Sequence, residues 1–92
     1  MTGAGGTVSA YVRLEGAGGA RRVRELLLTG DFFVTPPRMV LDLEAALRGV
    51  PVAEVGAAVD AFFAASKPDL LTIAPADFRS VVEKAVAAGG AA

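Results

Sequence analysis

Few side chains in this 92-residue chain could do chemistry. The sequence holds neither histidine nor cysteine, so it lacks the usual base at neutral pH, the commonest metal ligand and every thiolate function. Ser66 and Lys67 are adjacent at an expected helix end, where a solvated terminus is the better interpretation than an activated nucleophile. Asp42 and Glu44 are two residues apart on an expected helix and point to different faces, which favours a charged outer surface over an acid–base pair. We therefore predict no catalytic residue and no metal site.

The glycine-rich stretch 16–19 does not match a phosphate-binding loop, because no helix N-terminus follows it. Between two alternating segments it predicts a hairpin turn. Arg21, Arg22 and Arg24, with Arg13 on the neighbouring strand, could form a basic patch that faces a phosphate or an acidic partner domain. Arginines that protect a solvent-facing strand edge from aggregation would give the same pattern, so both interpretations stay open.

Composition restricts the partners. A formal net charge of −1 predicts no general attraction to nucleic acid or to an anionic membrane. The sequence has no apolar run of the roughly 20 residues that a spanning helix needs, and no signal-peptide pattern at its start. We therefore expect a cytoplasmic protein. Because 53% of the residues are hydrophobic, we also expect exposed apolar surface, which suits a subunit or a detached domain.

Hydrophobic periodicity predicts a hairpin near the N-terminus. Its strands span about 7–14 and 20–29, and the first strand alternates through Val8, Ala10, Val12 and Leu14. In the second strand Val23 is out of phase with Leu26 and Leu28, so we expect a bulge near Arg24–Glu25 that brings all three to one face. Residues 31–34 could form a short third strand.

Three helices are predicted after the hairpin, over about 37–48, 52–66 and 75–88. Thr35 is the expected cap of the first helix, Pro37 suits its first position, and Gly49 ends it. Gly56 is expected to mark a close helix crossing. Strands followed by helices indicate a two-layer α+β domain over residues 1–92, with flexible ends at 1–6 and 89–92.

Two adjacent phenylalanines follow the hairpin. Because neighbours on a strand face opposite sides, only one of Phe32 and Phe33 can easily reach the core of this sheet. The other must contact the following helix, which would bury both, or another polypeptide. Asp31 could cap backbone amides across the turn, or hold a basic residue of a partner.

The segment from Arg22 to Phe33, which ends in Gly-Asp-Phe-Phe, resembles the signature of the C-terminal, or accessory, domain of lipoate–protein ligases. In that family a proline-rich crossover follows, here Pro36-Pro37, and then a helix ending in Leu-Glu-x-x-Leu-x-Gly, here residues 43–49. The start of the last helix, residues 75–78, also resembles the end of the family pattern. The resemblance covers roughly residues 8–88.

The resemblance implies a role without catalysis by this chain. The catalytic lysine, ATP and lipoate belong to the large domain or subunit, which forms lipoyl-adenylate and transfers the lipoyl group to an acceptor domain. The accessory domain docks on that catalytic part and supports the adenylation step, and it contacts the acceptor only indirectly. We favour a separate small subunit over a domain cut from a longer chain. The expected interface residues are Gly30, Asp31, Phe32, Phe33, Pro36, Pro37, Arg22 and Arg24.

Two alternatives remain. The accessory domain resembles the fold of iron–sulfur cluster scaffold proteins, but a cluster needs thiolate ligands and this sequence has none. A general interaction module that forms a homodimer and buries its spare apolar surface is the other alternative.

Overall fold

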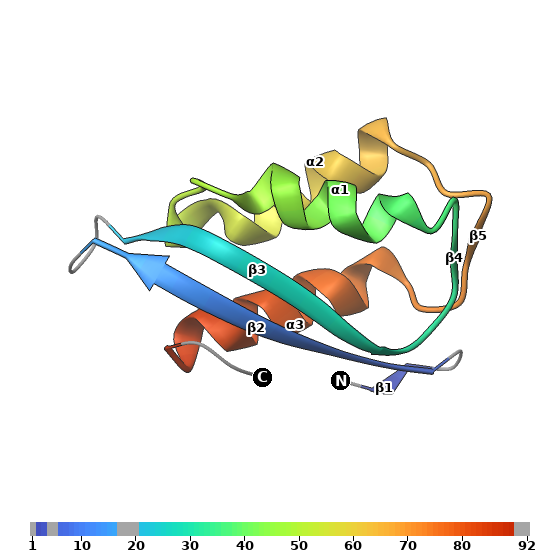
Figure 1. Ribbon diagram of the computed structural model, residues 1–92, viewed down its shortest axis with the longest axis horizontal. Coiled ribbons are helices and arrows are strands. Elements are labelled where there is room, and N and C mark those ends of the chain that lie inside the picture. The colour runs from blue at the N-terminus through green and yellow to red at the C-terminus, as the bar shows by residue number, and fades with distance from the viewer. Residues whose placement is uncertain (1, 4–5, 17–20, 90–92) are drawn as a thin grey trace.

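The computed structural model describes residues 2–3, 6–16 and 21–89 (Figure 1). Within these residues an antiparallel sheet has the order β1 (Thr2–Gly3), β2 (Gly6–Glu15) and β3 (Arg22–Asp31). Three helices, α1 (Arg38–Leu47), α2 (Val55–Ala65) and α3 (Pro75–Ala87), form the second layer, with α3 against β2 and α1 against β3. The predicted two-layer α+β architecture is confirmed. None of the described helices is long and apolar enough to cross a membrane.

The predicted bulge is present in the hairpin. Arg13 pairs with Glu25 and the next residue, Leu14, pairs with Val23, so Arg24 is the extra residue of β3. The bulge brings Val23 onto the buried face of β3, where periodicity alone would have put it on the outer face. The predicted turn begins with Gly16 at φ +89°, and residues 17–20 lie outside the described part of the chain.

The core fills the space between the sheet and the helices. Phe78 of α3, which is 1% exposed, lies at the centre of an aromatic group. Its ring meets Phe32 edge-on at 5.3 Å and Phe63 at 5.6 Å. Buried aliphatic side chains surround this group from every layer: Val8, Ala10, Val12, Val23, Leu26, Leu28, Leu43, Leu47, Val55, Val59, Ile73, Val81, Val82 and Ala85.

Most helix boundaries agree with the prediction. Gly49, at φ +85°, follows the end of α1, and Pro75 begins α3. The predicted second helix begins instead with a 3-10 turn, η2 (Val52–Glu54), before α2. The predicted Thr35 cap is wrong, because Thr35 lies in a strand and Pro37 precedes α1 without a side-chain cap.

A second, two-stranded sheet was not predicted. The segment 31–34 does not form a third strand of the main sheet: β3 runs on to Asp31, and β4 (Val34–Thr35) pairs with β5 (Leu70–Leu71). A strand of two residues is too short to show alternation, so neither β5 nor β1 was visible in the sequence. The flexible ends remain a prediction; residues 1, 4–5 and 90–92 lie outside the described residues.

The prediction that Glu44 lies on a charged outer surface is wrong. It is 9% exposed, and its carboxylate accepts the backbone N–H of Leu28 at 2.7 Å. Residues 49–52 cover the other end of the same strand edge, since Gly49 N–H donates to the Val23 carbonyl at 2.6 Å and Val23 N–H to the Val50 carbonyl at 2.9 Å. The outer edge of β3 is therefore covered by α1 and the segment that follows it.

Replacing Glu44 by alanine is expected to lower the free energy of unfolding by about 1–3 kcal/mol, because a buried backbone N–H loses its acceptor. Glu44→Gln is the matched control, since its amide oxygen can still accept the bond. Urea denaturation of both variants measures the difference. Equal destabilisation of the two would contradict the hydrogen-bond argument.

The predicted close approach at Gly56 is confirmed between α2 and α3. A Cβ at this position would overlap the Glu83 carboxylate and lie 2.7 Å from Nε of Arg79. Arg79 forms ion pairs with Asp60 and with Glu83, the latter at 3.4 Å. The hydrogen bond to Glu83 and, next in size, the charge of Asp60 raise the pKa of Arg79 above its usual value.

Candidate functional site: the crossover from β3 to α1

The residues predicted to form an interface lie at two separate places. Residues 30–37 form the crossover from β3 to α1, which includes β4 and lies beside β5 at one end of the molecule (Figure 1). Arg22 and Arg24 lie at the opposite end of β3, beside the bulge and the hairpin tip. The structure therefore does not bring the two arginines together with the Gly-Asp-Phe-Phe segment.

Gly30 is in this segment for a steric reason. Its φ is +146°, and it pairs with Val8 of the neighbouring strand. A Cβ here would overlap the carbonyl oxygen of Thr7 and lie 3.0 Å from the Cα of Val8. Only glycine combines this φ with such a close backbone approach.

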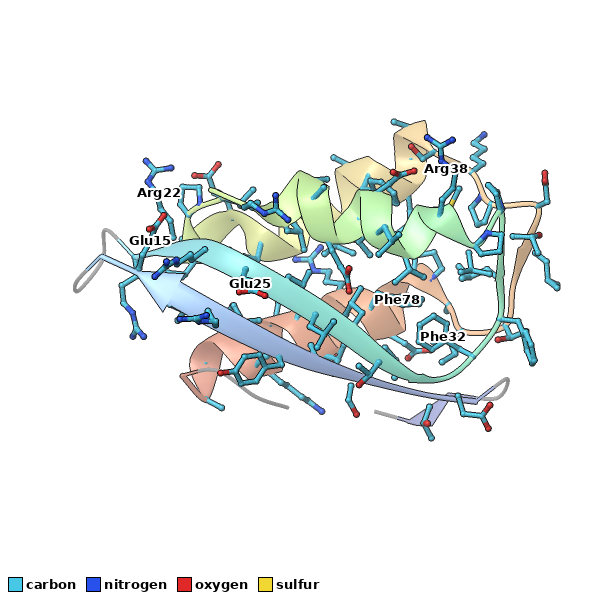
Figure 2. All side chains as sticks on the ribbon, viewed as in Figure 1. Glu15, Arg22, Glu25, Phe32, Arg38 and Phe78 are labelled. Atoms are coloured by element: carbon cyan, nitrogen blue, oxygen red, sulfur yellow. The ribbon has the colours of Figure 1, made fainter. Side chains whose placement is uncertain are left out.

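The two phenylalanines have separate environments. Phe32 is half-buried against Phe78, and Figure 2 shows the two rings side by side beneath α1. The Phe33 side chain is 68% exposed. Of the two alternatives left open by the sequence, burial of both rings is excluded, and Phe33 is free to contact another polypeptide.

The backbone of Phe33 is fixed although its side chain is exposed. Its N–H donates to the hydroxyl of Thr72 at 2.9 Å, and its carbonyl accepts the Thr72 N–H at 3.1 Å. The neighbouring Leu70 of β5 is 51% exposed, so the small sheet presents a second apolar side chain at this end of the molecule. Thr72 and Leu70 were missed from the sequence because the segment 69–74 has no periodic pattern.

Asp31 and the prolines complete the crossover. The N–H of Asp31 donates to the Thr7 hydroxyl at 3.4 Å, while its carboxylate is exposed and has no hydrogen-bond donor within reach in the described part of the chain. The amide-capping role is therefore not observed, and the alternative of a basic partner residue stays a prediction. Pro36 and Pro37 lead into α1, and their carbonyls accept the N–H groups of the residues three positions later at 3.0 and 3.3 Å. The Thr35–Pro36 peptide bond is cis.

The hairpin arginines have different roles. Nη1 of Arg22 donates to the Gly49 carbonyl at 2.9 Å and so ties β3 to the end of α1. Arg13 pairs across the strands with Glu25 at 3.6 Å, and both side chains are more than half exposed, so this pair adds little stability. Arg24, the bulge residue, is exposed. Arg22 thus has a structural role, whereas Arg24 is available for a partner.

Comparison with known proteins gives one informative match. No family model and no curated protein matches the chain. Among solved structures, the fold is similar to a chain in a structural analysis of an archaeal lipoylation system, described as a bi-partite lipoate protein ligase and its E2 lipoyl domain from Thermoplasma acidophilum. The TM-score is 0.69 and the sequence identity 23%. The two chains share a fold.

The match extends over most of both molecules, 84% of this chain and 82% of that chain, so the two are of nearly equal length. A fold from a bi-partite ligase system is what the Gly-Asp-Phe-Phe resemblance led us to expect, and that structural relation is confirmed. The similarity to iron–sulfur scaffold proteins stays a prediction.

Proposed function

We propose that this chain is the non-catalytic accessory subunit of a lipoate–protein ligase, which docks on the catalytic subunit and supports the ATP-dependent activation of lipoate to lipoyl-adenylate. The observation that carries the proposal is the fold shared with a chain from a bi-partite lipoate protein ligase system, over nearly the full length of both. The Gly30–Phe33 segment supports it independently, because it matches the accessory-domain signature in sequence. The cytoplasm is the expected location.

In this proposal the crossover is the docking surface. Phe33 offers an exposed aromatic ring on a backbone that Thr72 already holds in place, so little conformational entropy is lost when a partner covers it. Asp31, with a free carboxylate two residues earlier, is placed to receive a basic residue at the margin of the same contact. An exposed aromatic anchor with a charged neighbour is typical of residues that dominate protein interfaces.

The chain contributes to the reaction by closing a site on its partner. ATP and lipoate bind at the catalytic subunit, and the described side chains here supply no acid, base or nucleophile to the reaction. Docking excludes water and orders flexible loops around the nucleotide, which are the physical means by which a non-catalytic subunit promotes adenylation. The lipoyl acceptor domain is then modified by the catalytic subunit.

The direct test is adenylate formation from lipoate and ATP by the catalytic subunit of the same organism, with and without this chain. Stimulation that saturates at an equimolar ratio is expected. Absence of stimulation, together with absence of a complex on gel filtration, would refute the proposal and leave only a shared fold.

One observation favours a second candidate function, a homodimeric interaction module. The outer face of the sheet carries a cross-strand apolar pair, Tyr11 and Leu27, which are 52% and 50% exposed. A second copy could cover this pair. Sedimentation of the isolated chain distinguishes the candidates, because a stable dimer without any effect on adenylation would support the module.

A further inference from the structure

Within the described residues, one edge of the main sheet has no partner strand over most of its length. The far edge of β3 is covered by Glu44 and by residues 49–52, as described above. On its other side β2 is covered near its start, where β1 pairs with Gly6 and Thr7. From Ser9 to Glu15, no described residue pairs with β2 on the side away from β3. Unpaired N–H and carbonyl groups along such an edge are a template for another strand.

A groove of about 460 Å³ follows this open edge. Residues 11–14 line it from β2, Ala88 and Gly89 from the end of α3, and Arg21 from the start of the second hairpin arm. Its lining includes residues from both faces of β2 and, from the arm that leads into β3, Arg21, so among the described residues the groove lies along β2 where this strand passes the end of α3. It is at the opposite end of the molecule from the crossover (Figure 1).

The lining has a definite chemical character. Its two charged residues, Arg13 and Arg21, are both basic, and the remaining lining residues are Tyr11, two aliphatic residues of β2, Ala88 and Gly89. The nearby acids lie outside the lining: Glu25 pairs with Arg13 across the sheet, and Glu15 is exposed at the end of β2. Arg21 has no acidic partner within ion-pair distance in the described residues. The positive charge of the groove therefore selects an occupant with carboxylates.

We propose that this groove binds an extended, acidic segment of a second polypeptide, which adds to β2 as a new antiparallel or parallel strand. Backbone hydrogen bonds to the β2 edge supply affinity, apolar side chains of the segment pack beside Tyr11 and Leu14, and its carboxylates pair with Arg13 and Arg21. The proposal goes beyond the ligase function and does not depend on it. It assigns the chain a second interaction surface, separate from the crossover.

Amide hydrogen exchange of the full chain, followed by NMR, tests the proposal. The probe is a capped peptide that alternates glutamate with valine and has the length of the segment 9–15; a lysine–valine peptide of the same length is its control. Amides of β2 that point away from β3 exchange quickly in the free chain, and saturating acidic peptide is expected to slow them by about tenfold or more. The lysine–valine peptide should leave them unchanged.

Charge reversal gives the matched variants. Arg21→Glu should weaken binding of the acidic peptide by about tenfold or more, whereas Arg48→Glu, the same change at an exposed arginine after α1, should not. The proposal is overturned if the acidic peptide fails to protect the edge amides at about 1 mM, if both peptides protect them equally, or if it binds without protecting them. It is also overturned if these amides are already protected in the free chain and lose that protection when residues 90–92 are deleted, because the C-terminus of the chain would then occupy the groove.

Discussion

Replacing Gly30 by alanine is expected to lower the free energy of unfolding by about 2–5 kcal/mol, the largest stability effect that we expect from a single added methyl group in this chain. Two costs combine. An alanine resists the φ of +146°, and its Cβ would overlap the Thr7 carbonyl oxygen at the end of the β2–β3 ladder next to the crossover. Because the atoms that this Cβ would meet belong to the backbone of Thr7 and Val8, the two strands must separate locally to relieve the overlap.

Gly49 provides a control that isolates the clash. It also has a positive φ, +85°, but a Cβ there would have no atom within 4 Å. Gly49→Ala should therefore cost only the conformational penalty, about 1–2 kcal/mol. Urea denaturation of both variants gives the comparison. If the two alanines destabilise the chain equally, the steric role assigned to Gly30 is wrong, and only its backbone conformation matters.

Strong periodicity made much of the fold predictable. The hairpin strands are ten residues each, long enough for alternation to be visible, and the out-of-phase Val23 indicated the bulge. The helices were recognisable from regular stripes such as Phe78, Val81, Val82 and Ala85. Apolar residues recur with period two on a strand or 3.6 on a helix because one face of the element is buried, so the spacing indicates both the element and its buried face.

The features that escaped prediction depend on contacts between distant segments. The β4–β5 pair joins residues 34–35 to residues 70–71 and is too short to have a period. Glu44 was misassigned because burial of a carboxylate depends on a donor sixteen positions away, the Leu28 N–H. Local sequence carries no signal for either.

In the candidate site, too, the local motif was predictable from the sequence but the contacts with distant residues were not. Sequence reasoning identified the Gly-Asp-Phe-Phe segment but left open whether both phenylalanines are buried or one of them faces another polypeptide. The packing of Phe32 on Phe78 decides this, and Phe78 is forty-six positions further along the chain. Within one short motif, Gly30 and Phe32 therefore maintain the fold, while Asp31 and Phe33 face outward.

The outward position of Phe33 leads to the functional prediction with the largest expected effect. Phe33→Ala should leave the fold intact, because the ring is 68% exposed and the hydrogen bonds of its backbone to Thr72 do not involve the side chain. Its affinity for the catalytic ligase subunit should fall by about 2–4 kcal/mol, which is thirtyfold or more, as for an aromatic anchor at the centre of an interface. Asp31→Ala should cause a smaller loss, since a charge at the margin contributes less than a buried ring.

Calorimetric titration of the catalytic subunit measures these affinities, and thermal unfolding of each variant measures its stability. Leu27→Ala is the matched control: it removes another exposed apolar side chain, 50% exposed, from the outer face of the sheet outside the crossover. It should bind as the unaltered chain does. If Phe33→Ala instead unfolds while its affinity per folded molecule is unchanged, the ring stabilises the fold and the docking surface lies elsewhere. If it remains folded and only affinity and adenylation fall, the exposed phenylalanine is the contact through which this chain acts on the catalytic subunit.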